Sequence, residues 1–223
     1  MNDHSAKLLR CIPQKVVARL RASAWELPEK QDRSVAVAFV DIESCTRLCE
    51  DLLPKEMNHV IETRFSRFFD AVERAGGTVN EIMGDGFMAI FDDDEISDNA
   101  RAAVSAALEI QLQNRQLNTH RTAHSDPILV NIGIHCGIGL VGFSKFRSSS
   151  GERWTYTVSG SVTNIAARLC ALATGGELLV SADLASHIDN ETYALEPLGA
   201  QQLKNVSRPV LTFRLTDSDS CAQ

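Results

Sequence analysis

A hairpin pattern in the first half of the sequence is the feature that most restricts the fold. The apolar runs TVNEIM and FMAIF are joined by Gly84-Asp85-Gly86, and an Asp-Gly pair between two such runs is a strong signal for a tight turn between antiparallel strands. Upstream, the β-branched run VAVAFVDI at residues 35–42 has the composition of a buried central strand. Together, the hairpin and this run predict a chain built around a β-sheet.

Helical patterns alternate with the predicted strands. Large apolar residues lie on one face of a segment from Pro54 to about Ala75, and a second helix is expected from Ala100 to about Leu117. Further strands are expected at 128–136, 138–143, 153–158, 178–181, 193–200 and 209–215, with a polar loop at 144–152 and a helix at 161–173. The order strand–helix–strand–strand–helix–strand predicts an α+β protein, a ferredoxin-like α/β sandwich with a C-terminal extension.

The first 34 residues differ in charge from the remainder of the chain. They carry seven Lys or Arg against four Asp or Glu, whereas the whole chain has a formal net charge of −7. Residues 7–25 are typical of a basic amphipathic helix interrupted at Pro13, which fits a docking arm or dimer contact better than a membrane surface. Residues 27–34 are polar and predict a linker. We therefore expect an N-terminal arm at 1–32, one catalytic domain at 33–216 and a disordered tail at 217–223.

Composition and charge exclude several classes of protein. The acidic remainder argues against a broad nucleic-acid surface. The longest apolar run, Val35 to Val40, is far shorter than the roughly 20 residues that span a bilayer, and the N-terminus lacks the apolar core of a signal peptide. The six cysteines show no C-x-x-C spacing, so we expect reduced thiols in a cytoplasmic protein.

Two aspartates follow from the predicted strands as a candidate metal site. Asp41 ends the buried strand and Asp85 lies at the hairpin tip, so neighbouring strand ends can bring the two carboxylates together. Hard oxygen ligands in this arrangement bind Mg²⁺ or Mn²⁺, and a pair of ions can hold a triphosphate. Asp85 is equally explained by the turn alone. The hydroxyls of Ser44 and Thr46, at a turn that enters a helix, can hold phosphate oxygens or simply cap that helix.

A second candidate group lies on the helix expected at 161–173. Ser161 is a suitable N-cap, and Asn164 and Arg168, four positions apart, share one helix face. An amide beside a guanidinium suits a ribose and a phosphate, whereas a solvated Asn and a salt-bridged Arg are the structural alternative. The G-x-G-x-x-G pattern at 137–142 is not followed by a helical pattern, so it predicts a tight turn between strands rather than a dinucleotide site.

Five segments resemble, in the same order, motifs of class III adenylate/guanylate cyclase catalytic domains. They are FVDIESCTRL, GGTVNEIMGDGFMAIF, GIHCGIGLVG, YTVSGSVTNIAARL and LGAQQLKNV, and the resemblance covers about residues 33–216. It implies the class III cyclase fold in a head-to-tail homodimer with two active sites at the interface. It also implies conversion of a nucleoside triphosphate to a 3′,5′-cyclic nucleotide and pyrophosphate.

The resemblance assigns roles to individual residues. Asp41 and Asp85 of one chain would bind two Mg²⁺ or Mn²⁺ ions, assisted by the Ile42 carbonyl. The other chain would supply Asn164 to orient the ribose and Arg168 to stabilise charge on the α-phosphoryl group. In the motif LKN, Lys204 matches the lysine with which the family binds the triphosphate.

The residues that read the base depart from the pattern of adenylate cyclases. Those enzymes usually have Lys at the position of Glu81 and Asp at that of Thr157, and Asp is also usual at Ser161. Guanylate cyclases carry Glu at the first position, and a carboxylate can accept hydrogen bonds from guanine, from the cytosine amine or from the uracil imide. Phe39 is expected either to line the base pocket or to pack in the core.

The short arm and the RWTYTVSGSVTN variant are similar to stand-alone pyrimidine cyclases of bacterial anti-phage (Pycsar) signalling. This similarity implies UTP or CTP as substrate, cyclic UMP or cyclic CMP as product, and a separate cyclic-nucleotide effector protein. Adenylate and guanylate cyclase remain alternatives. A diguanylate cyclase or palm-like enzyme, which would show a GG[DE]EF hairpin or a basic nucleic-acid track, and an inactive binding module are more distant ones.

Overall fold

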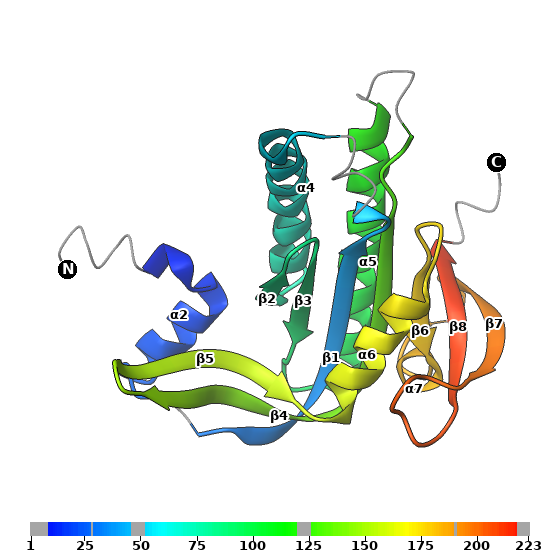
Figure 1. Cartoon of the computed structure of the whole chain (residues 1–223). Helices are drawn as coiled ribbons and strands as arrows, with labels where there is room; N and C mark the ends of the chain where they lie inside the picture. The colour runs from blue at the N-terminus through cyan, green and yellow to red at the C-terminus, as the bar shows by residue number, and fades with distance from the viewer. Residues whose placement is uncertain (1–8, 28, 46–51, 120–125, 190, 218–223) are drawn as a thin grey trace.

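The computed structural model describes residues 9–27, 29–45, 52–119, 126–189 and 191–217, and its centre is one eight-stranded sheet (Figure 1). The strands are β1 (Gln31–Ile42), β2 (Thr78–Met83), β3 (Gly86–Phe91), β4 (Val130–Ser148), β5 (Gly151–Ser159), β6 (Leu178–Ser181), β7 (Tyr193–Gln201) and β8 (Val210–Asp217). The helices are α2 (Gln14–Ala22), α4 (Pro54–Arg74), α5 (Ile96–Thr119), α6 (Ser161–Leu172) and α7 (Ala182–Ala185), with a 3-10 turn at Leu9–Cys11. The strand order is β2-β3-β1-β4-β6-β8-β7, and β5 pairs with β4.

The first four strands confirm the predicted ferredoxin-like sandwich. Strand β1 lies between β3 and β4 and is antiparallel to both, and β2 is antiparallel to β3. Helices α4 and α5 make the two crossovers and pack on the same face of the sheet (Figure 1). Strand β6 then joins β4 in parallel, and β8 and β7 complete the C-terminal extension.

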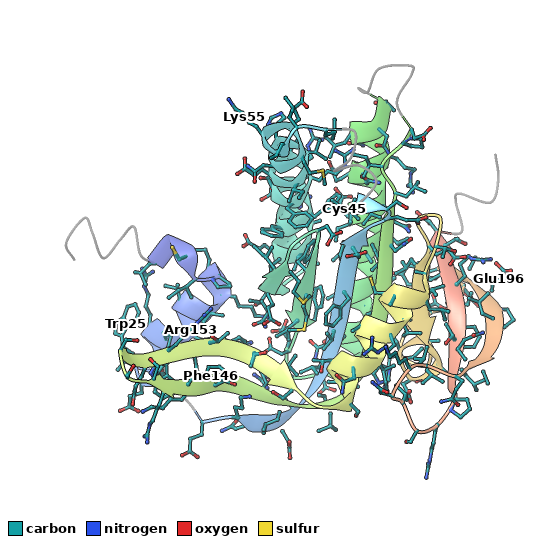
Figure 2. The ribbon with its side chains drawn as sticks, viewed as in Figure 1. Trp25, Cys45, Lys55, Phe146, Arg153 and Glu196 are labelled. Carbon is teal, nitrogen blue, oxygen red and sulfur yellow. The ribbon has the colours of Figure 1, made fainter. Side chains whose placement is uncertain are left out.

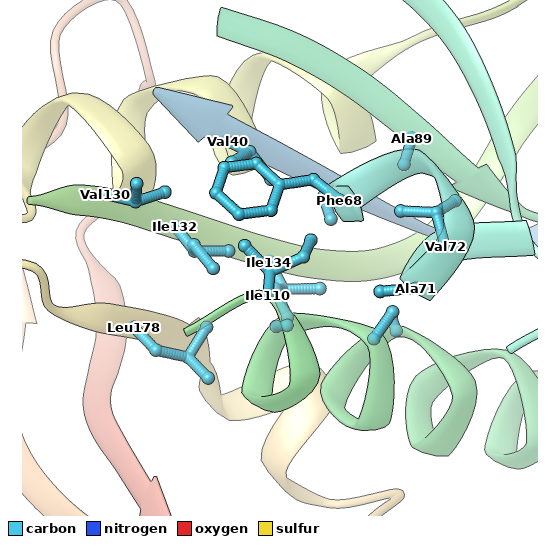
Figure 3. Packing of buried hydrophobic residues seen from close by; sticks show 14 of the residues in the cluster. Val40, Phe68, Ala71, Val72, Ala89, Ile110, Val130, Ile132, Ile134 and Leu178 are labelled. Atoms are coloured by element: carbon cyan, nitrogen blue, oxygen red, sulfur yellow. The ribbon is translucent and has the colours of Figure 1, made fainter. Parts of the chain in front are cut away.

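The main core lies between the sheet and helices α4 and α5. Figure 3 shows Phe68 of α4 and Ile110 of α5 close to Val40 of β1 and Ile132 of β4. Each of these side chains is at most 2% exposed, and burying a side chain of this size contributes about 1.5–3 kcal/mol. The core therefore fixes the end of β1, where Asp41 lies.

The opposite face of the sheet is covered by α6 and α2. Val162 and Ala166 of α6, and Val16 and Leu20 of α2, are buried in one apolar cluster on this face. Helix α6 packs along β1 and β4 (Figure 1). Because successive side chains of a strand point to opposite faces, the odd-numbered residues of β1 share the face covered by α6.

Strand β4 contradicts two expectations from the sequence. It runs without a break through 137–142, where we predicted a tight turn, and it continues to Ser148 through the predicted loop. Within this pattern, Gly139 is needed for close packing rather than for a turn, and the same holds for Gly133 earlier in β4. A Cβ on Gly139 would lie 2.6 Å from a methyl carbon of Val158, and one on Gly133 would lie 2.0 Å from a backbone nitrogen of α6.

The predicted polar loop is the outer part of a long hairpin. Residues 140–148 of β4 pair with 151–159 of β5, and we call this hairpin the β4–β5 arm. It extends from the edge of the sheet beneath α2 (Figure 1). Its polar residues are compatible with strand structure because both faces of the outer arm are largely exposed to solvent.

Three boundaries also differ from the predictions. Strand β1 begins at Gln31, within the predicted linker, because Gln31 already pairs with Val141 of β4. Helix α5 begins at Ile96, one turn earlier than expected. The N-cap of α6 is Gly160, with φ 135°, so Ser161 is the first helical residue and does not cap the helix.

Two expectations from composition were compared with the described residues. None of the described helices is both long enough and apolar enough to cross a membrane. Among the described cysteines, Cys11, Cys136 and Cys170 are free thiols.

Candidate active site

The predicted acid pair lies at one end of the sheet, where β1 ends beside the β2–β3 turn. Asp41 is opposite Gly86 in the β1–β3 ladder, and the amide of Ile42 donates to the Asp85 carbonyl at 3.1 Å. A Cβ on Gly86 would lie 2.8 Å from Oδ1 of Asp41, so the carboxylate needs a glycine at this point of the hairpin. The fold therefore brings the two aspartates together.

The charge of this pair is uncompensated within the described chain. Burial, and then the negative charge of Asp85, raise the pKa of Asp41 to about 6. No described Lys, Arg or His forms an ion pair with either aspartate. Two adjacent carboxylates without a counter-charge favour a divalent cation, and oxygen ligands of this kind suit Mg²⁺ and Mn²⁺.

The residues present fit such ions. The described ranges contain no group of three or more His, Cys, Asp or Glu that could hold a metal by itself. Mg²⁺ is usually bound by one or two carboxylates and takes its other ligands from water and substrate phosphates. Asp41, Asp85 and the backbone carbonyl of Ile42 would provide the protein part of that ligand set.

The backbone turns sharply after Asp41. Ser44 has a left-handed φ of 56° and is exposed, so its hydroxyl lies at the surface near the acid pair. The neighbouring Glu43 carboxylate accepts a hydrogen bond from the Gly175 amide at 2.6 Å, which ties this turn to the end of α6. Thr46, the second predicted phosphate ligand, lies outside the described residues.

Helix α6 carries Asn164 and Arg168 on a face away from the sheet. Val162 and Leu169 are at most 1% exposed on the sheet side, whereas Asn164 is exposed and Arg168 half-buried. No ion pair joins Arg168 to an acid in the part of the chain that the structure describes. The alternative of an arginine held in a salt bridge of its own chain is therefore not observed here.

Lys204 lies in the connection between β7 and β8, beside α6 (Figure 1). The preceding Leu203, 5% exposed, packs with Leu169 of α6 in one apolar cluster. Asn205 has a φ of 62°, so the chain turns directly after the lysine. The fold thus holds Lys204 at the surface near the helix that carries Arg168.

The acidic and basic groups form no ion pair with each other in the described part of the chain. No ion pair links Asp41 or Asp85 to Arg168 or Lys204 among the described residues. Each group has exposed or half-exposed side chains without a counter-charge. One copy of the chain therefore presents an acidic group, Asp41 with Asp85, and a basic group, Arg168 with Lys204, which we call the two candidate half-sites.

Glu81 and Thr157 line one cavity of about 620 Å³, which we call the base cavity. Its walls are β2 and the β4–β5 arm, and Figure 2 labels Phe146 and Arg153 on the arm. Asn80 Nδ2 donates to Thr157 Oγ1 at 3.4 Å across this space. The remaining lining residues are Ile82 and Thr155.

Sequence reasoning missed part of this lining. Asn80, Phe146 and Arg153 were not proposed as site residues. Phe146 lies in the segment 144–152, which was predicted as a loop, whereas Arg153 begins the predicted strand at 153–158. The alternation of side chains in RWTYTV is the signal that could have found Arg153, since residues 153, 155 and 157 share one face of a strand. Phe39, by contrast, packs against the apolar cluster beneath α6 and is not part of the cavity wall.

The comparison with known proteins decides the family. The model of the adenylate and guanylate cyclase catalytic domain matches residues 27–217. The chain belongs to this family. The match includes both half-sites and the base cavity, so the class III cyclase domain extends from just before β1 to the end of β8.

Similar proteins include enzymes named for two different bases. An adenylate cyclase of Anabaena cylindrica is 29% identical over 168 residues, 72% of this chain and 32% of that protein. The crystal structure of the adenylyl cyclase CyaB from P. aeruginosa has a TM-score of 0.75 at 26% identity and covers 86% of this chain and 97% of that one. The crystal structure of the guanylyl cyclase Cya2 has a TM-score of 0.73 at 27% identity and covers 85% of this chain and 95% of that one. The chain spans about a third of the length of the bacterial curated relatives it matches.

Proposed function

We propose that the chain is a nucleotide cyclase that converts a nucleoside triphosphate into a 3′,5′-cyclic nucleotide and pyrophosphate. One observation carries this proposal. Asp41 and Asp85 are adjacent and have no described cationic partner, and burial, followed by the negative charge of Asp85, raises the pKa of Asp41 to about 6. A carboxylate pair of this kind is ready to bind divalent cations, in a domain whose family forms cyclic nucleotides.

The acidic group and the residues that follow Asp41 would bind the metal ions and the phosphates. Asp41, Asp85 and the Ile42 carbonyl hold the ions, and Ser44 and Thr46 hold phosphate oxygens. When bound, two Mg²⁺ or Mn²⁺ ions supply a lowered pKa for the ribose 3′-hydroxyl and positive charge for the leaving pyrophosphate. The hydroxyl then attacks the α-phosphorus in line, and pyrophosphate leaves.

Asn164, Arg168 and Lys204 would act from the other side of the substrate. The Arg168 guanidinium stabilises negative charge that develops on the α-phosphoryl group. Lys204 binds the β- and γ-phosphates, and the Asn164 amide orients the ribose so that its 3′-hydroxyl faces the phosphorus. These are positive and polar groups without a described partner of their own.

A head-to-tail homodimer would complete the site. The acids of one copy and the α6 residues of the other supply opposite charges, which form no ion pair with each other in the described part of one chain. Two-fold symmetry then produces two identical sites at the interface between the two copies. This assembly accounts for the exposure of both the acidic and the basic side chains on each copy.

We favour a pyrimidine nucleotide as substrate, UTP or CTP. Uracil presents an imide N–H between two carbonyls, and the base cavity offers an acceptor in Glu81 and a donor in Arg153. The amide of Asn80 and the hydroxyl of Thr157 can serve either the carbonyl or the amine of a pyrimidine. The cavity lacks the Lys and Asp with which adenylate cyclases read adenine. A cyclic pyrimidine nucleotide made in the cytoplasm would serve anti-phage signalling through a separate effector protein.

The test is incubation of the chain with ATP, GTP, CTP and UTP in the presence of Mn²⁺, with products resolved by mass spectrometry. We expect cyclic UMP or cyclic CMP as the main product. Asp85→Ala should form none, whereas Asp94→Ala, which removes an exposed acid outside the site, should retain activity. Conversion of ATP or GTP alone would overturn the pyrimidine assignment, and no cyclic product from any nucleotide would overturn the cyclase.

Glu81→Lys tests the base cavity separately. Replacing the acceptor with a donor should shift preference toward a base with an acceptor edge, such as adenine. The measurement is the ratio of kcat/KM values for the four nucleotides. An unchanged ratio would mean that Glu81 does not contact the base.

A further inference from the structure

Helix α2 is part of the folded body of the chain. Val16 and Leu20, 1% and 6% exposed, pack with Met88 and Ile90 of β3 and with Val158 of β5. Because these apolar side chains leave water when α2 docks, the helix is held against the sheet and the β4–β5 arm.

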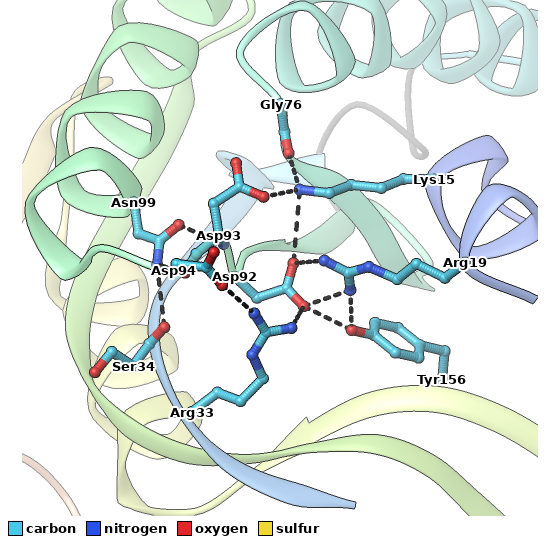
Figure 4. Close-up of polar contacts among 10 residues, drawn as sticks. All are labelled: Lys15, Arg19, Arg33, Ser34, Gly76, Asp92, Asp93, Asp94, Asn99 and Tyr156. Atoms are coloured by element: carbon cyan, nitrogen blue, oxygen red, sulfur yellow. Dashed lines mark hydrogen bonds and ion pairs between the residues drawn. The ribbon is translucent and has the colours of Figure 1, made fainter. Parts of the chain in front are cut away.

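One buried carboxylate joins α2 to the arm (Figure 4). Asp92, directly after β3, is 0% exposed, and Arg19 donates to both its oxygens, with Nη2 2.7 Å from Oδ1. Tyr156 of β5 donates its hydroxyl to Asp92 Oδ2 at 2.6 Å, and Arg19 also donates to that hydroxyl. The three side chains therefore form a closed set of hydrogen bonds between α2, β3 and β5.

The same helix also forms a hydrogen bond close to the other wall of the base cavity, strand β2. Lys15 Nζ donates to the Gly76 carbonyl at 2.6 Å, two residues before β2 begins. A smaller cavity of about 360 Å³ lies between the start of α2 and β2, and Asn80 lines both this cavity and the base cavity. Helix α2 is thus bonded near β2 and to β5, the two elements that face each other across the base cavity.

We infer that Arg19 is a positioning residue for base recognition. It acts through Asp92 and Tyr156, which hold β5 in place. Side chains alternate along a strand, so anchoring Tyr156 beneath α2 leaves Thr157 turned toward β2 and sets its separation from Glu81. The inference rests on the proposed function, because it assumes that the substrate base enters this cavity.

Two variants remove the connection while keeping most of the packing. Arg19→Met removes the charge but keeps a long side chain, and Tyr156→Phe removes only the hydroxyl. Arg33→Met is the matched control, because Arg33 lies 3.7 Å from Asp92 Oδ2 but makes no hydrogen bond to Tyr156. All three are made in the full chain, and thermal unfolding shows which are folded.

Base selectivity separates positioning from a purely structural role. For Arg19→Met and Tyr156→Phe we expect KM for the preferred nucleotide to rise about tenfold, with kcat little changed. The ratio of kcat/KM values between bases should fall. The reason is that even a small displacement of β5, one wall of the base cavity, weakens binding of the base. In the Arg19→Met/Tyr156→Phe double variant, KM and base selectivity should be changed no more than in the more affected single variant, because both residues act through the same connection. Arg33→Met should lower the unfolding temperature and leave the ratio between bases unchanged.

Hydrogen exchange of the β5 amides tests the connection itself, with or without turnover. We expect faster exchange around Thr157 in the two variants than in Arg33→Met. Unchanged selectivity in both folded variants, or unchanged β5 exchange, would overturn the inference. If the wild-type chain forms no product, the proposed function fails, and selectivity is then measured as dissociation constants of the four nucleotides with Mn²⁺. If the ratios of these dissociation constants between nucleotides are the same in wild type and variants, or if no nucleotide binds, this inference is overturned as well.

Discussion

Acidic residues near the two ends of β3 lie in opposite electrostatic environments. Near its start, Asp41 and Asp85 have no described cationic partner, and the pKa of Asp41 is raised to about 6. Just after its end, burial opposes the ionisation of Asp92, but hydrogen bonds from Arg19 and Tyr156 outweigh it and lower its pKa. Where the chain supplies a cationic side chain, as at Asp92, the acid stabilises the fold. Where it does not, the acids are available to bind a cation from solution.

The largest effect should come from removing an acid at the start of β3. Asp41→Asn should lower turnover at least on the order of 10³-fold, because the protein then lacks one of its two carboxylate ligands for the ions. The same variant should unfold at a higher temperature than wild type without metal, since it relieves the repulsion from Asp85. Cyclic-nucleotide formation and metal-free thermal unfolding measure the two effects.

Asp94→Asn is the control for this variant, because Asp94 is an exposed acid whose ion pair among the described residues is with Arg33. It should change neither activity nor stability by much. An Asp41→Asn chain that stays active, or that becomes less stable without metal, would contradict the contrast between the two ends of β3.

The opposite behaviour is expected at the end of β3. Asp92→Asn should lower the free energy of unfolding by about 3 kcal/mol, because it leaves Arg19 without its buried counter-charge. Addition of Mn²⁺ should not restore this loss, since Asp92 is not a ligand in our account. Urea denaturation with and without Mn²⁺ gives the measurement, and a variant as stable as wild type would contradict a structural role for Asp92.

The two environments also predict opposite pH dependences. The folded pKa of Asp41 is raised from 3.8 to about 6, so its ionisation costs stability at neutral pH. This cost decreases as the pH falls below about 6 and is lost once the pH is below the unfolded value of 3.8. The folded pKa of Asp92 is lowered, so its stabilisation is present above its unfolded pKa and is lost only as the pH falls further, through its folded value.

Cation binding should follow the ionisation of Asp41. The affinity for Mn²⁺ is expected to fall by up to about tenfold per pH unit below about pH 6. Calorimetric titrations at pH 7, 6 and 5 measure this fall, with Asp41→Asn as the reference that should show little binding at any pH. An affinity that does not change over this range would contradict the raised pKa.

The sequence predicted the parts of the molecule that depend on local patterns. The Asp-Gly turn predicted the β2–β3 hairpin, and the position of Asp41 at a strand end predicted its meeting with Asp85. Both follow from short-range rules for turns and from the geometry of antiparallel strands. The position of Asn164 and Arg168 on one face of a helix was also predicted from a local pattern, the spacing of four residues.

The parts that depend on distant contacts were not predictable. Asp92 lies in the acidic run FDDDE, which is typical of a solvated turn, and nothing near it indicates an arginine 73 positions earlier. Likewise, the G-x-G-x-x-G pattern of β4 indicates a turn locally, whereas close packing against Val158 and α6 requires its Gly139 within a strand. In both cases tertiary contacts determine the structure.

The most direct test of the shared site mixes two inactive chains. Asp41→Ala lacks the acidic half and Arg168→Ala lacks the basic half, and alone each should lose most activity, about 10²–10³-fold in kcat for Arg168→Ala. Random pairing would make about half the dimers mixed, each with one complete site, so about a quarter of wild-type activity should return. No recovery in verified mixed dimers would contradict a site built from two copies of this chain.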